Sequence, residues 1–65
     1  MLRFDLEKQV SRNIMDNLHS AIYQSDLKVA AAYLDHHDIN THLGGNHVAI
    51  LNANGERVAI ITEED

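Results

Sequence analysis

The chain contains no cysteine, no proline and only three glycines among its 65 residues. Without cysteine it has no disulfide to stabilise a fold and no thiolate to bind a metal or attack a substrate. The absence of proline and the low glycine content argue against a linker or a low-complexity tail. Hydrophobic residues make up 45% and charged residues 23% of the chain, a balance typical of a folded domain. We therefore expect residues 1–65 to form a single small domain.

Long hydrophobic segments are also missing. The longest uninterrupted apolar run covers residues 29–34, far short of the ~20 residues that span a bilayer. No charged-then-apolar leader opens the chain. The sequence therefore predicts a cytoplasmic protein without a membrane contact, and its start at Met1 without a tail or linker suggests a complete gene product.

Positive charge is scarce, since five Lys and Arg face ten Asp and Glu and the formal net charge is −5. Proteins that bind nucleic acid usually present a basic patch, because neutralising phosphates supplies much of their affinity. Here three of the cations lie in the first twelve residues, interleaved with acids. The lack of a basic patch therefore argues against direct nucleic-acid binding. An acidic surface instead favours a basic protein partner, such as the nucleic-acid-binding face of another protein.

The first third of the chain carries apolar residues four positions apart. Leu6, Val10, Ile14, Leu18 and Ile22 would lie on one face of a helix. This pattern predicts a helix over residues 5–22, with Asp5 as its N-cap.

A second helix is expected to follow after a short link. Ser25 is a suitable N-cap residue, and Leu27, Ala30, Ala31 and Leu34 share one face. The helix should end between residues 35 and 38. Because the link is short, the two helices should pack against each other.

After Asp38 the apolar residues alternate with a period of two, which is typical of strands. Three strands are expected over residues 39–43, 47–52 and 56–62, joined by turns at Gly44-Gly45 and Asn54-Gly55. The sequence thus predicts an α+β fold, in which two N-terminal helices pack on a C-terminal three-stranded antiparallel meander.

The predicted sheet is apolar on both faces, and two short helices cover only one. A two-residue turn at Asn54-Gly55 pairs Leu51 with Val58, while a turn at Gly44-Gly45 sets His42 opposite His47. An uncovered apolar face usually marks an interaction site. The candidate interface has four apolar residues, with two histidines at the rim: Ala49, Leu51, Val58, Ile60, His42 and His47. The alternatives are helices that straddle both faces, or a register slip that reassigns them.

Histidine is the one enriched residue with metal-binding chemistry. His36, His37, His42 and His47 fall within twelve positions, beside Asp35 and Asp38. Imidazole and carboxylate groups bind zinc, nickel or copper, and imidazole titrates near neutral pH. No established ligand spacing accompanies these histidines, so we expect no metal or other cofactor. They keep open an alternative function, a metal- or pH-responsive sensor.

Catalytic motifs are not recognisable in this chain. It has no strand-Ser-helix elbow, glycine-rich phosphate loop or paired-carboxylate spacing, and a fold this small leaves little room for a deep pocket. We therefore expect a protein that is not an enzyme. The predicted function is a small acidic protein-binding regulator or inhibitor, homodimeric through its apolar sheet face. A third reading is a small nucleic-acid-binding domain that uses Lys8 and Arg12.

Overall fold

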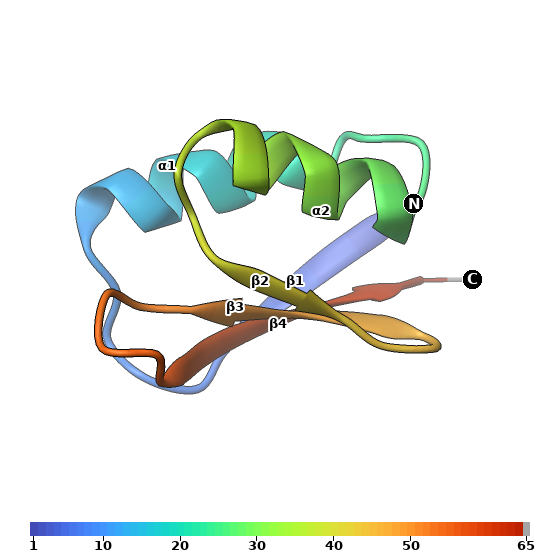
Figure 1. The fold of residues 1–65 in the computed structure, drawn as a ribbon. Helices are drawn as coiled ribbons and strands as arrows, with labels where there is room; N and C mark the ends of the chain where they lie inside the picture. Colours follow the sequence, from blue (N-terminus) through green and yellow to red (C-terminus); the bar gives the residue numbers. More distant parts are fainter. Residues whose placement is uncertain (65) are drawn as a thin grey trace.

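The structure, a computed structural model, describes residues 1–64, and it forms two layers (Figure 1). Both helices lie on one side of a four-stranded sheet, and the other side carries no helix. The strands are all antiparallel, in the order β1-β4-β3-β2. Along the chain the elements are β1 (Leu2–Leu6), α1 (Arg12–Ala21), α2 (Leu27–His36), β2 (Thr41–Leu43), β3 (His47–Leu51) and β4 (Arg57–Glu63). The predicted α+β class is confirmed.

The first strand, β1, was not expected from the sequence. Residues that were predicted to open a long helix instead form an edge strand paired with β4. The prediction of an N-terminal helix pair followed by a three-stranded meander is therefore wrong in its arrangement. The physical reason is visible in the pattern Leu2, Phe4, Leu6, where apolar residues alternate with Arg3 and Asp5 as a strand requires.

Helix α1 begins at Arg12 rather than near Asp5. Its N-cap is Ser11, whose hydroxyl oxygen accepts a hydrogen bond from the backbone N–H of Ile14 at 3.3 Å. The spacing of four residues from Leu6 to Ile14 continues the helical pattern only by coincidence, because Leu6 belongs to β1 and Val10 to the connecting loop.

Helix α2 follows the prediction closely. Asp26, rather than Ser25, caps it, and the Asp26 carboxylate accepts the Val29 N–H at 2.9 Å. The helix ends at His36, within the expected range. Its apolar face, formed by Leu27, Ala30, Ala31 and Leu34, is buried as predicted.

The hairpin between β2 and β3 differs from the expected one by one residue at its turn. The Gly44 N–H bonds the His47 carbonyl at 2.8 Å, which makes Gly45-Asn46 the turn instead of Gly44-Gly45. His42 consequently lies opposite Ala49, and not opposite His47. When the turn moves by one residue, each residue of β2 is paired with a residue two positions further along β3. Residues two positions apart point to the same face of a sheet, so the residues of β2 keep their predicted faces although their partners change.

The hairpin between β3 and β4 includes the predicted Asn54-Gly55, but its turn is one residue longer than predicted. The Asn52 N–H bonds the Glu56 carbonyl at 2.9 Å, and the Gly55 N–H bonds the Asn52 carbonyl at 3.0 Å, so residues 53–55 form a three-residue loop. Gly55 adopts a φ of 80°, a left-handed conformation that glycine tolerates without strain. The predicted pair Ile50–Ala59 is confirmed, but the next residue, Leu51, lies opposite Arg57. The register therefore skips Val58, which is the extra residue of a β-bulge in β4.

The core lies between the helix layer and the sheet. Val48, Ile50, Ala59 and Ile61 point toward the helices, and each is fully buried. From the helices, Leu18, Ala21 and Leu34 fill the other side, and Leu2 closes the core at β1.

Neither helix within residues 1–64 is long and apolar enough to cross a membrane.

Candidate functional site

The sheet face turned away from the helices is the main uncovered surface, and we call it the open face. Directly opposed residues of antiparallel strands share a face. One row across the sheet runs from His42 through Ala49 and Ile60 to Asp5, and a second runs from His47 through Thr62 to Arg3. Leu51 and Arg57 form a third, shorter row. Because successive side chains of a strand point to opposite faces, all of these residues lie on the face away from the helices.

The centre of the open face is apolar. Ala49 is 6% exposed, and it lies outside the main core cluster. Leu51 and Ile60 are half-buried. These three residues were predicted to form the interface, and the register places them on the side that no helix covers (Figure 1).

Val58 was expected beside them, and this expectation is wrong. Its side chain is 1% exposed and packs in the core cluster with Ala59. The cause is the bulge, which lets two consecutive residues of β4 face the same layer. The carbonyl of Val58 accepts two bonds from the loop after β1, from Glu7 at 2.8 Å and Lys8 at 3.1 Å. The apolar strip is therefore narrower than the sequence suggested.

The two histidines predicted at the rim lie on the open face, but in different rows of the sheet. His42 is on the edge strand β2, and His47 is opposite Thr62 near the turn. The ring of His47 fills the space above Gly44, where an added Cβ would collide with the His47 Cε1 atom. The predicted direct opposition of His42 and His47 is therefore not found, because His42 lies opposite Ala49.

Charged residues from β1 border the open face, and sequence reasoning missed them because it missed the strand. The Arg3 guanidinium lies 2.9 Å from the Asp5 carboxylate. The hydrogen bond and charge of Asp5 raise the pKa of Arg3 above its ordinary value. At the opposite end of β4, Arg57 pairs with Glu7 at 2.6 Å. The open face thus has an apolar centre and a border that carries both signs of charge.

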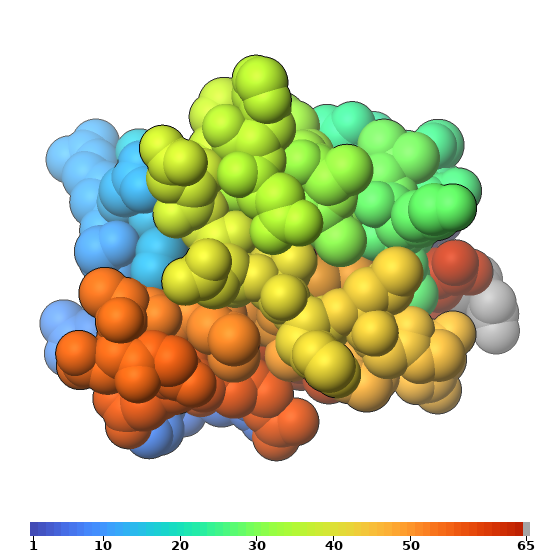
Figure 2. All heavy atoms as spheres, in the orientation of Figure 1, coloured from blue at the N-terminus to red at the C-terminus, as the bar shows by residue number. Residues whose placement is uncertain are grey.

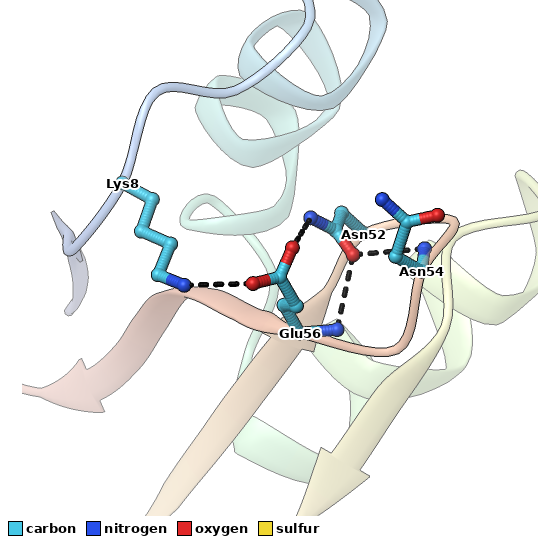
Figure 3. A network of polar contacts seen from close by, with 4 residues as sticks. All are labelled: Lys8, Asn52, Asn54 and Glu56. Carbon is cyan, nitrogen blue, oxygen red and sulfur yellow. Dashed lines mark hydrogen bonds and ion pairs between the residues drawn. The ribbon is translucent and has the colours of Figure 1, made fainter.

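A polar network supports the end of the open face near Leu51 (Figure 3). The Asn52 carboxamide oxygen accepts the backbone N–H groups of Asn54 at 2.9 Å and Glu56 at 3.0 Å. The Glu56 carboxylate in turn accepts from Lys8 at 2.9 Å and from the Asn52 amide at 3.3 Å. These bonds, with Lys8 the largest contribution, lower the pKa of Glu56. The network ties the loop after β1 to the β3–β4 turn.

A shallow cleft of about 450 Å³ borders the open face at Leu51. The start of α1, the α2–β2 loop and the β3–β4 turn meet there, at the left end of the molecule in Figure 2. Val10, Ile14 and Ile39 line it with apolar groups, while Asn40 and Asn54 add amides. The lining thus combines apolar groups with amides and one acidic residue, Asp38, and it includes Leu51 of the apolar strip.

The histidines predicted as metal candidates do not converge. His36 and His37 sit at the end of α2 with their rings 5.5 Å apart and nearly perpendicular, and the ring of His37 lies 4.5 Å from that of Tyr33. Along residues 1–64 no group of three or more His, Asp or Glu side chains is placed to hold a metal ion.

Comparison with known proteins gave no match to a family model, a curated protein or a solved structure.

Proposed function

We propose that this chain is a small cytoplasmic protein-binding regulator that docks on a partner protein through the open face. The observation that carries the proposal is the apolar strip of Ala49, Leu51 and Ile60 on a sheet side that the helices leave uncovered. Burying a leucine or isoleucine side chain stabilises a contact by roughly 1.5–3 kcal/mol, so this strip supplies the centre of an interface.

The charge distribution supports a protein partner rather than a nucleic acid. Arg3, Lys8 and Arg57 each lie within 3 Å of a carboxylate of their own chain. Cations that are already paired neutralise few phosphates, and the net charge of −5 opposes approach to a polyanion. The same acidic balance favours a partner with a basic surface, including a nucleic-acid-binding protein, and the role at that surface is inhibitory or regulatory.

The substitution Leu51→Asp tests this function, with Leu43→Asp as a matched control. Leu43 is a 46% exposed leucine in the same sheet, but its partner in the register, Val48, faces the helices. Proteins captured by the wild-type bait from the cell that produces it should be retained by Leu43→Asp. They should bind Leu51→Asp at least about tenfold more weakly, which corresponds to about 1.4 kcal/mol. Equal capture by both folded variants would contradict docking through the open face.

A further inference from the structure

At the free edge of β1, the backbone N–H and C=O groups of alternate residues point away from the sheet. The Glu64 N–H bonds the Met1 carbonyl at 2.7 Å, and the Glu7 N–H bonds the Val58 carbonyl at 2.8 Å. In an antiparallel ladder these two bonds flank residue pairs that exchange no hydrogen bonds, Leu2–Glu63 and Leu6–Ala59. By alternation Phe4 belongs to the same class. The N–H and C=O groups of Leu2, Phe4 and Leu6 therefore point away from β4, toward the free edge.

The sequence of β1 is chemically symmetric about Phe4. Read in either direction it is leucine, a charged residue, phenylalanine, a residue of opposite charge, and leucine. An antiparallel second copy centred on Phe4 would set Leu2 opposite Leu6 and Arg3 opposite Asp5. In that alignment the hydrogen-bonded pairs fall on Leu2, Phe4 and Leu6, the residues whose backbone groups are free.

Charge selects this alignment over its neighbours. A shift by two residues in one direction would set Arg3 opposite Arg3, and in the other direction Asp5 opposite Asp5. Like charges directly opposed on one face destabilise a strand pair. Both side chains are 54% exposed at the edge, within reach of a second chain. Leu6, which is 45% exposed, gains a leucine partner only in the Phe4-centred alignment.

The other free edge lacks these properties. Strand β2 has three residues and no charged pair, and its Thr41 hydroxyl already donates to Asp35 at 3.1 Å. Short edge strands are a common means of avoiding unwanted pairing. The two edges of this sheet are therefore unequal, and β1 is the one suited to pairing.

We propose that β1 pairs with β1 of a second copy, in antiparallel orientation about a two-fold axis through the Phe4 pair. Two hydrogen bonds at each of three residue pairs give about six backbone bonds across the interface. The two sheets join into one, with all four helices on one side. The two open faces then become continuous on the other side. This inference concerns a separate surface and does not rest on the proposed docking function.

The test is a mixing experiment with Arg3→Asp and Asp5→Arg. Each variant alone sets like charges opposite each other in the Phe4-centred alignment, so each should remain near the 7.3 kDa monomer mass in light scattering. An equimolar mixture sets opposite charges across the interface again and should form dimers of twice that mass. Each chain still lacks its internal Arg3–Asp5 pair in the mixture, so restored dimers are explained only by contact between chains. A mixture that stays monomeric while the wild type dimerises would overturn the proposal.

Two further measurements use chains that keep both charges. Leu6→Lys should abolish the dimer, whereas Leu43→Lys, at an equally exposed leucine on the other edge, should leave it intact. In the wild type, the amide hydrogen of Phe4 should become slower to exchange as concentration rises, while that of Asp5, already bonded to β4, should not change. A wild-type protein that stays monomeric up to about 1 mM overturns the inference. A dimer lost in Leu51→Asp but kept in Leu6→Lys would instead place self-association on the open face and also overturn it.

Discussion

Asn52 organises the β3–β4 turn through its side chain. Its oxygen accepts two backbone N–H groups while its amide donates to Glu56 (Figure 3). The sequence Asn54-Gly55 was enough to locate the turn, because few residues other than glycine tolerate a φ near 80°, but it did not give the length of the turn, which also includes Ala53. The role of Asn52 was missed, although an asparagine at the first position of a turn often bonds the backbone ahead of it. The partner Lys8 was not predictable, since it comes from a strand–helix loop that the sequence placed inside a helix.

The carboxyl group of Glu56 should titrate below its ordinary value of 4.5. A carboxyl whose pKa is lowered on folding stabilises the fold above its unfolded pKa, and this contribution is lost as the pH falls through the folded pKa. Lys8→Met should therefore raise the Glu56 pKa and reduce the acid dependence of stability below pH ~4.5. NMR titration of the Glu56 side-chain carbonyl carbon measures this. Lys28→Met, at an exposed lysine on α2, should leave the Glu56 titration unchanged.

Among the elements, β1 shows best how a local pattern misleads. Residues 2–6 alternate as a strand, but the apolar spacing from Leu6 to Ile22 also fits one helix face. Only the pairing with β4, more than fifty positions away in the chain, decides between them. Local propensity contains no information on that contact, whereas α2 and the location of the β3–β4 turn depend on neighbours in sequence and were predicted. The bulge at Val58 escaped prediction for the same reason, because its carbonyl is bonded by the loop after β1.

The two leucines of β1 should differ sharply in their contribution to stability. Leu2 is 3% exposed and in the core, whereas Leu6 is 45% exposed. Leu2→Ala should lower the free energy of unfolding by about 2–4 kcal/mol, and Leu6→Ala by less than about 1 kcal/mol. Urea denaturation of the two variants at low concentration, where self-association is absent, checks this. Equal losses would contradict the difference in burial between these two leucines, which lie on the same face of β1.

For the molecule as a whole, the hydrophobic pattern predicted the layer arrangement and its uncovered side. The apolar residues of β3 and β4 exceed what two ten-residue helices cover, so one face had to remain open. What the pattern lacked was β1, which adds Arg3 and Asp5 to that face and gives it a charged border. The open face is consequently less apolar than the sequence suggested, and its chemistry is that of a docking surface with a small apolar centre.

A fold of this size has a small free energy of unfolding, so shortening a single core side chain should unfold much of the population. Leu34 on α2 is fully buried between the layers. Leu34→Ala should cost about 2–5 kcal/mol, comparable with a total stability of about 5 kcal/mol. Val29→Ala on the same helix, at a 41% exposed position, should cost well under half as much. Thermal melts followed by circular dichroism compare the two, and similar melting temperatures would contradict the assigned core.

The pairing of β1 with β4 also constrains the order of events during synthesis. Within residues 1–64 β1 is translated before the other strands of the sheet, yet the strand that it pairs with, β4, is translated after all of them. Until then the nascent chain exposes Leu2 and Phe4 with no partner strand, and domains of this kind fold as a unit. Closing the sheet therefore has to wait until β4 has been translated, and a polypeptide stalled before β4 would leave the edge-forming segment available to other chains.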